Sequence, residues 1–159
     1  MLSFAMIALI VSANVSFSQS EMPFNKDSVR NFLFKADAGQ VPGKLRQRLN
    51  PEENFLELKG NTATLQLVSL VNQNMGRNGV GGVTHTGPIS SLEIFKKTNL
   101  IEISFVLKAA RAMISIEVKF WDDGETKVMI DPMNTPVSID LFGSMYKIGQ
   151  TEVNKGTNK

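Results

Sequence analysis

Histidine chemistry in this chain depends on one residue, His85, which lies in the stretch GGVTHTGP at residues 81–88. A neutral imidazole suits general-base catalysis near pH 7. A serine hydrolase would pair it with Ser90 or Ser91, but no Gly-x-Ser-x-Gly turn is present to expose such a serine. Because the apolar Val83 is two residues away, an extended segment places both side chains on one face. We therefore expect a ring packed against a sheet, with a hydrolase that uses His85 as general base as the alternative.

Other reactive groups are scarce. The chain has no cysteine, which excludes thiolate chemistry, and one histidine cannot build a multi-histidine metal centre. The stretch from Gly76 to Gly82 lacks the Gly-Lys-Ser/Thr ending of a phosphate-binding loop, so we interpret it as a mobile connection. Asp122 and Asp123 lie at a predicted turn, where solvated aspartates are common. The sequence predicts neither a cofactor nor a metal site.

Several side chains are candidates for ligand binding without catalysis. An exposed indole or phenyl ring can stack on a sugar or contact an apolar patch of a partner, and alternating cations share one face of an extended strand. The alternatives are that the tryptophan covers one end of the core and that the cations form a solvated face. The candidates are Trp121, Phe142, Tyr146, Lys44, Arg46 and Arg48.

The elements that must position these residues are strands, because apolar residues beyond Phe32 recur at every second position. The alternating runs span residues 32–36, 56–58, 63–67, 92–94, 101–107, 112–120, 128–130 and 137–141. Such closely spaced runs predict a mainly β fold, with an antiparallel sheet of about eight strands that forms a curled, barrel-like domain or a sandwich.

Turn signals separate these runs. Asp123-Gly124 predicts a two-residue hairpin turn, and the segments 59–62 and 108–111 predict short reversals. Gly87-Pro88 predicts a bend between a short strand and the next one.

Two other kinds of segment remain. The prolines in residues 131–136 predict a connection, because proline lacks the N–H that a central strand needs. Only residues 25–34 and 42–49 could form a turn or two of helix.

The amino-terminal segment resembles an export signal. Residues 2–15 are apolar and uncharged, and the small polar residues 16–20 follow them. The apolar run is shorter than the roughly 20 residues that a transmembrane helix needs. We expect a signal peptide at 1–18, a single β domain at 19–150 and a flexible polar tail at 151–159. The alternative is a tethering or internally packed helix.

The composition limits the partners. With no cysteine there is neither a disulfide framework nor a lipid-anchor site, so an apolar core must supply stability. The formal net charge of +2 is too small to indicate a nucleic-acid-binding protein. After cleavage the protein is not expected to span a membrane.

The order of several segments is similar to that of a secreted bacterial family classed only as a domain of unknown function, family 4251. The segments are FLFKADAG, NFLELKGNTATLQL, GGVTHTGPI, IEISFVLK, ISIEVKFWDDGETKVMI and NTPVSIDLFG, and the resemblance runs from about Phe32 to Gly143. His85 replaces a usual aromatic residue and Thr135 a usual arginine, and residues 67–76 replace a Leu-Pro-Tyr-Phe-Gly-like stretch. The family has no established activity, so the resemblance implies an exported, mainly β protein.

These observations together favour a non-enzymatic module that is exported to the periplasm or the cell exterior. Its expected ligand is an envelope glycan, a lipid or another envelope protein. An assembly subunit that uses an exposed strand edge is a further alternative.

Overall fold

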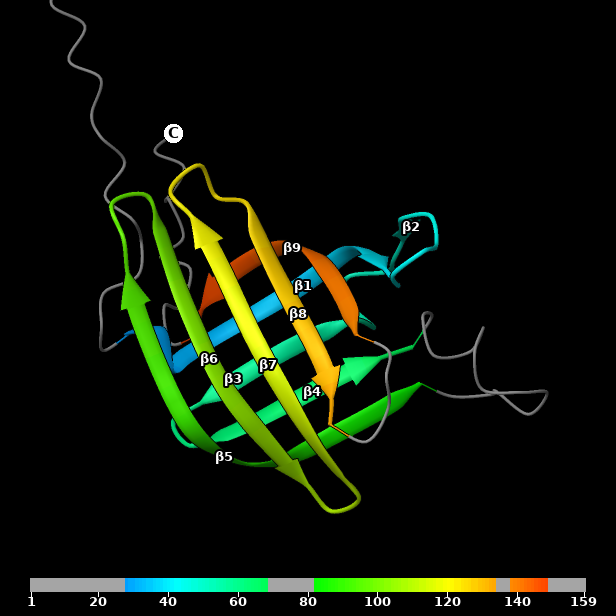
Figure 1. The fold of residues 1–159 in the computed structure, drawn as a ribbon, viewed down its shortest axis with the longest axis horizontal. Coiled ribbons are helices and arrows are strands. Elements are labelled where there is room, and N and C mark those ends of the chain that lie inside the picture. The colour runs from blue at the N-terminus through cyan, green and yellow to red at the C-terminus, as the bar shows by residue number, and fades with distance from the viewer. Residues whose placement is uncertain (1–27, 69–81, 134–137, 149–159) are drawn as a thin grey trace, which may run out of the picture.

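The computed structural model describes residues 28–68, 82–133 and 138–148, and these residues form one antiparallel sheet (Figure 1). The short 3-10 turn η1 precedes the strands. The elements are η1 (Ser28–Arg30), β1 (Asn31–Gln40), β2 (Gln47–Arg48), β3 (Phe55–Lys59), β4 (Thr62–Leu67), β5 (Val83–Lys96), β6 (Leu100–Ala109), β7 (Ala112–Trp121), β8 (Thr126–Pro132) and β9 (Ile139–Lys147).

The sheet closes on itself as a barrel. Each strand from β3 to β8 pairs with the next one along the chain, and β1 pairs with both β3 and β9. The short β2 pairs only with the far end of β1 and lies outside this circuit. Figure 1 shows β6, β7 and β8 crossing in front of β1, β3 and β4. The predicted antiparallel fold is therefore confirmed, and of the two expected forms the barrel is the one observed.

The barrel interior is filled by side chains. Alternate residues along the strands are buried, as the twofold periodicity predicted. The large rings of Phe32, Phe34, Phe105 and Phe120 all point inward, and each is at most 3% exposed. Eight strands enclose a space just wide enough to be packed by side chains or to hold one small ligand. In this protein the apolar core fills that space.

The long strand β5 bends to join two parts of the barrel. Its first residues pair with β4, whereas residues from Ile89 onward pair with β6. The register shifts between Ser90 and Glu93, and Ser91 has a φ of 56°. The predicted break at Gly87-Pro88 is therefore wrong, because the chain continues as one strand and turns at a β-bulge instead.

The turns largely follow their sequence signals. Gly60-Asn61 joins β3 to β4 and Ala110-Arg111 joins β6 to β7, so both predicted reversals are confirmed. The predicted hairpin between β7 and β8 is also confirmed.

The β7–β8 turn is longer than predicted. Gly124 has a φ of 91° and donates its N–H to Trp121 O at 3.1 Å, and Trp121 N–H donates to Glu125 O at 2.9 Å. Asp123 does not share the positive φ that a two-residue type I′ turn requires at both centres, so the chain uses a longer turn with glycine at its last position.

Three local expectations are wrong. Residues 42–49 form no helix but a turn followed by β2, whereas the 3-10 turn Ser28–Arg30 is a single turn of helix within residues 25–34, as expected. Pro132 belongs to β8, where it pairs with Ile114 at the strand end and no later ladder bond is needed. Of the alternating cations, only Arg48 lies in a strand.

Some predictions lie outside the described residues. They concern the signal peptide at 1–18, the glycine-rich stretch from Gly76 to Gly81, the first residue of the predicted strand at 137–141 and the polar tail at 151–159. The described residues include no helix with the length and hydropathy of a membrane span.

Candidate functional site

A cavity of about 260 Å³ lies at the corner where β8, β9 and β1 meet. Three of the residues predicted to bind a ligand, Trp121, Phe142 and Arg46, line this cavity together. They come from β7, from β9 and from the loop before β2. The remaining lining residues are Asp37, Glu125, Thr126, Lys127 and Gly143.

Irregular backbone creates the hollow. The register of the β1–β9 pair shifts between Ala36 and Ala38, which leaves Asp37 as the extra, exposed residue of a bulge. On the facing strand, a Cβ at Gly143 would collide with the carbonyl oxygen of Lys35. Glycine at this position therefore lets β1 and β9 approach each other closely at the base of the cavity.

Phe142 forms one wall of the cavity and lies beneath two cations. The Arg46 guanidinium carbon is 3.8 Å from the ring centroid, and Lys127 Nζ is 5.8 Å from it. Lys127 also forms an ion pair with Asp140 at 2.9 Å. The face of an aromatic ring attracts cations, so Phe142 holds the otherwise exposed Arg46 side chain over the sheet.

Thr126 contributes a polar group without a partner. The residue is 3% exposed, and its Oγ1 is buried and forms no hydrogen bond within the described residues. Thr126 has the core-facing phase of β8, since it pairs with the buried Phe120 and with Gly143. A buried hydroxyl without a hydrogen bond costs about 1–3 kcal/mol. A χ1 rotation could direct this hydroxyl toward a polar group that enters the cavity.

The charges of the lining balance. Arg46 and Lys127 are cationic, whereas Asp37 and Glu125 are carboxylates. The backbone positions the acidic side: Asp37 O accepts from Leu49 N–H at 2.8 Å, and Glu125 O accepts from Trp121 N–H. The cavity therefore offers hydrogen-bond donors and acceptors beside two aromatic rings, without a strong net charge.

The other predicted ligand residues lie outside the cavity lining. Tyr146 is 51% exposed on the outer face of β9, opposite Leu33 of β1. Lys44 lies in the turn before β2, and Arg48 pairs with Ala38. The structure thus separates the six candidates into a group at the cavity and a group elsewhere on the surface.

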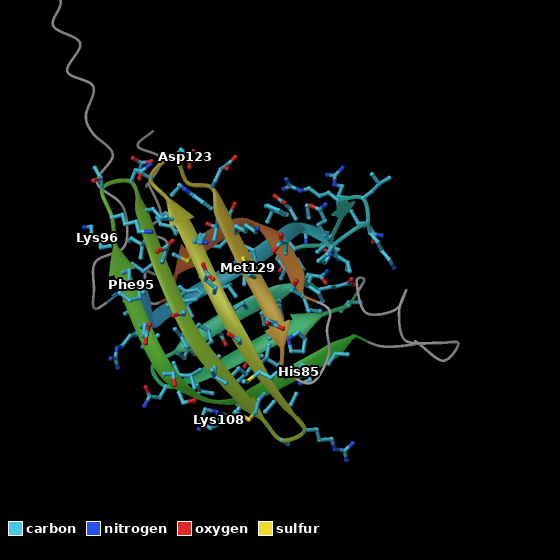
Figure 2. All side chains as sticks on the ribbon, viewed as in Figure 1. His85, Phe95, Lys96, Lys108, Asp123 and Met129 are labelled. Atoms are coloured by element: carbon cyan, nitrogen blue, oxygen red, sulfur yellow. The ribbon has the colours of Figure 1, made fainter. Side chains whose placement is uncertain are left out.

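His85 lies far from the cavity. It pairs with the buried Leu65, so its ring has the inward phase of β5 and is partly buried. Burial lowers the pKa of His85 below its ordinary value of 6.5, because the charged form is poorly solvated there. Figure 2 shows His85 at the opposite end of the barrel from Asp123, which is in the β7–β8 turn beside the cavity.

Five of the eight residues that line the cavity were not predicted from the sequence. They are Asp37, Glu125, Thr126, Lys127 and Gly143, and nothing local in the sequence indicates that a bulge and a turn bring them together. Thr126 did carry a signal: it precedes the apolar Val128 and Ile130 at spacing two, which indicates a polar residue on the core face. Among the described residues, no group of three or more histidine, aspartate or glutamate side chains could hold a metal ion.

Comparisons with known proteins agree with this architecture. The crystal structure of a DUF4251 family protein from Bacteroides eggerthii DSM 20697 superposes with a TM-score of 0.65 at 21% sequence identity, covering 84% of this chain and 91% of that chain. At this identity the likeness shows the fold alone. No curated protein matches the chain. The family model described as "Domain of unknown function (DUF4251)" matches residues 27–145, and the chain therefore belongs to the DUF4251 family.

Proposed function

We propose that this protein is an exported, non-enzymatic binding module and that the cavity lined by Trp121 and Phe142 is its ligand site. The apolar amino-terminal run followed by small polar residues supports export to the periplasm or the cell exterior. The observation that carries the proposal is that two aromatic residues from different strands border one cavity whose lining includes Thr126, a residue with a buried hydroxyl that has no partner.

Among the expected ligands, the cavity favours a neutral glycan. Sugars present apolar ring faces and many hydroxyl groups, which fit aromatic walls with carboxylates and cations between them. Since the lining charges balance, an anionic ligand gains little from this cavity. The volume of about 260 Å³ is below the roughly 300–1,000 Å³ of pockets for drug-sized ligands, so it suits one sugar ring.

The alternative, a hydrolase with His85 as general base, places its chemistry at the other end of the barrel. The inward phase of His85 beside Leu65 favours a packing role for that ring.

The single tryptophan allows a direct test. Because Trp121 is the only tryptophan in the chain, its fluorescence reports on the cavity alone. We expect a saturable emission change when the protein is titrated with neutral di- to tetrasaccharides of glucose and N-acetylglucosamine. Phe142→Ala should weaken the response strongly. Tyr146→Ala, which removes an exposed ring outside the cavity, is the matched control and should leave the response unchanged.

Thr126→Val separates a ligand-binding role from a structural one. The substitution keeps the shape and removes the unpartnered hydroxyl, so we expect the free energy of unfolding to rise by about 1 kcal/mol. Sugar affinity should fall about five- to tenfold, the value of one hydrogen bond. Thr64→Val, at a hydroxyl 3.2 Å from Thr86 Oγ1 on the outer face, is the control. No response to any sugar in the panel, or unchanged affinity in Thr126→Val, would contradict the proposal.

A further inference from the structure

The loop between β1 and β2 presents the most exposed of the large hydrophobic side chains in the described part of the chain. Leu45 is 88% exposed, compared with 60% for Met133 and 56% for Phe95. Figure 1 shows this loop projecting beyond the barrel strands beside β2. A single exposed leucine is ordinary on a protein surface, so its surroundings decide whether it has a role.

The backbone holds this leucine outward. Gly43 has a φ of 76°, and Lys44 N–H donates to Val41 O at 2.9 Å, which closes the turn just before Leu45. Gln40 Nε2 donates to Lys44 O at 3.1 Å. Val41 and Leu49, at the two ends of the loop, are only 8% and 5% exposed. The loop is therefore anchored at both ends, and its tip presents the Leu45 side chain to solvent.

The charged residues within the loop itself are all cationic. Lys44, Arg46 and Arg48 are all exposed, and no acidic residue occurs from Val41 to Asn50. Of the nearest acidic residues, Asp37 lines the cavity beside Arg46, and Glu52 forms an ion pair with Lys35 at 2.6 Å. An apolar tip flanked by cations has the chemistry of a segment that inserts into an anionic lipid interface.

We propose that this loop contacts an anionic lipid bilayer, with Leu45 entering the headgroup layer and Lys44 and Arg48 lying against lipid phosphates, while Arg46 stays stacked on Phe142. A purely polar anionic glycan could use the cations but would gain nothing from the leucine. Each cation near an anionic surface contributes about a fivefold increase in partitioning, which is screened by salt. Two cations and one leucine thus predict weak, reversible association. This proposal is independent of the sugar-binding cavity.

Sedimentation with lipid vesicles tests the proposal on the mature protein. We expect retention on vesicles that contain phosphatidylglycerol at low ionic strength, with loss in high salt and little binding to pure phosphatidylcholine. Lys44→Gln/Arg48→Gln should lower partitioning about 25-fold, and Leu45→Ser about tenfold. Arg46 is left intact in these variants because it also stacks on Phe142, so the cavity is preserved.

Matched controls change the same chemistry elsewhere. Phe95→Ser removes an exposed apolar ring, and Lys96→Gln/Lys108→Gln removes two exposed cations. In Figure 2 these residues lie away from the β2 loop, across the barrel. The controls should retain vesicle binding and, like the test variants, the parent melting temperature.

Three results would overturn the proposal. They are no retention on anionic vesicles, equal loss in Lys96→Gln/Lys108→Gln, which would indicate net charge alone, and retention that is insensitive to Leu45→Ser. Sugar-induced Trp121 fluorescence in the same variants reports separately on the cavity.

Discussion

The interior of this barrel is formed by regular strands, whereas the cavity on its outer surface depends on irregular backbone. Inside, residues alternate regularly, and rings such as Phe34 and Phe105 fill the space. Outside, at the β8–β9–β1 corner, the cavity depends on departures from regularity: the bulge at Asp37, the close approach at Gly143 and the loop that carries Arg46 over Phe142. Regular alternation along the strands places apolar side chains in the core, whereas irregular backbone at the corner creates the surface cavity.

This difference indicates where a ligand can bind. An eight-stranded barrel can hold a small ligand only if its core leaves room, and here the inward rings occupy that room. A binding site must then be formed on the surface, where bulges and loops redirect side chains. The comparison predicts that stability and ligand binding respond to different phenylalanines.

The largest expected effect contrasts Phe34 with Phe142. Phe34 is fully buried, so Phe34→Ala should lower the free energy of unfolding by about 3–5 kcal/mol. Phe142 is partly exposed under Arg46, so Phe142→Ala should cost about 1 kcal/mol while weakening sugar binding. Urea denaturation of the two variants measures the difference. Equal destabilisation would show that the outer ring belongs to the core and would remove the basis of the comparison.

The interior could be predicted from sequence because the signal is local. In residues 112–120 each apolar residue is followed by a polar or less buried one, and this alternation alone assigns the inward face. The cavity could not be predicted in this way. Asp37 and Glu125 are far apart in the chain and meet only because β1 pairs with β9 and β9 with β8. Sequence reasoning identified Trp121, Phe142 and Arg46 by residue type, without a reason for them to be close.

We expect the second largest effect on stability in the β7–β8 turn beside the cavity. Gly124→Val places a β-branched residue at a φ of 91°, which should cost about 1–3 kcal/mol. Gly124→Asn is the control, because asparagine tolerates positive φ and should cost less. Thermal unfolding of both variants tests the ranking. If valine and asparagine were equally tolerated, the turn would not constrain the end of β7 that carries Trp121.

Substitutions of His85 test whether this residue serves only to pack its ring on the inward face of β5. His85→Phe keeps a planar ring and should leave the free energy of unfolding nearly unchanged, whereas His85→Asp should cost about 1–2 kcal/mol by partly burying a charge. Denaturation midpoints give both values. If His85→Phe kept the melting temperature but abolished a cellular phenotype that deletion of the gene produces, the histidine would have a chemical role.

The same residue predicts a pH dependence. Burial lowers the pKa of folded His85, so the unfolded chain binds the proton more tightly. The stability that neutral His85 contributes is fully present above pH 6.5, its ordinary pKa value, and is lost as the pH falls below 6.5. His85→Phe should remove this loss in urea denaturation between pH 8 and about pH 5.

Glu102 shows that the loss of stability above pH 5 does not come from this carboxylate. The hydrogen bond from Lys97 lowers the pKa of Glu102 below 4.5, so its contribution is lost only at more acidic pH. A loss above pH 5 that persisted in His85→Phe would have to come from another group.

The smallest effect concerns the bend of β5, an irregularity that shapes the barrel without forming a site. Ser91 has a φ of 56°, which costs a non-glycine residue about 1–2 kcal/mol. Glycine removes this strain but increases the entropy of the unfolded chain by about 0.5–1 kcal/mol, so Ser91→Gly should stabilise by only ~0.5 kcal/mol. Ser91→Val should destabilise, since a β-branched residue tolerates this conformation least. Stability ranked Gly, Ser, Val in denaturation experiments would confirm that the bulge is fixed by the barrel. The order Val above Ser would mean that residue 91 is extended in solution, and β5 would then bend elsewhere.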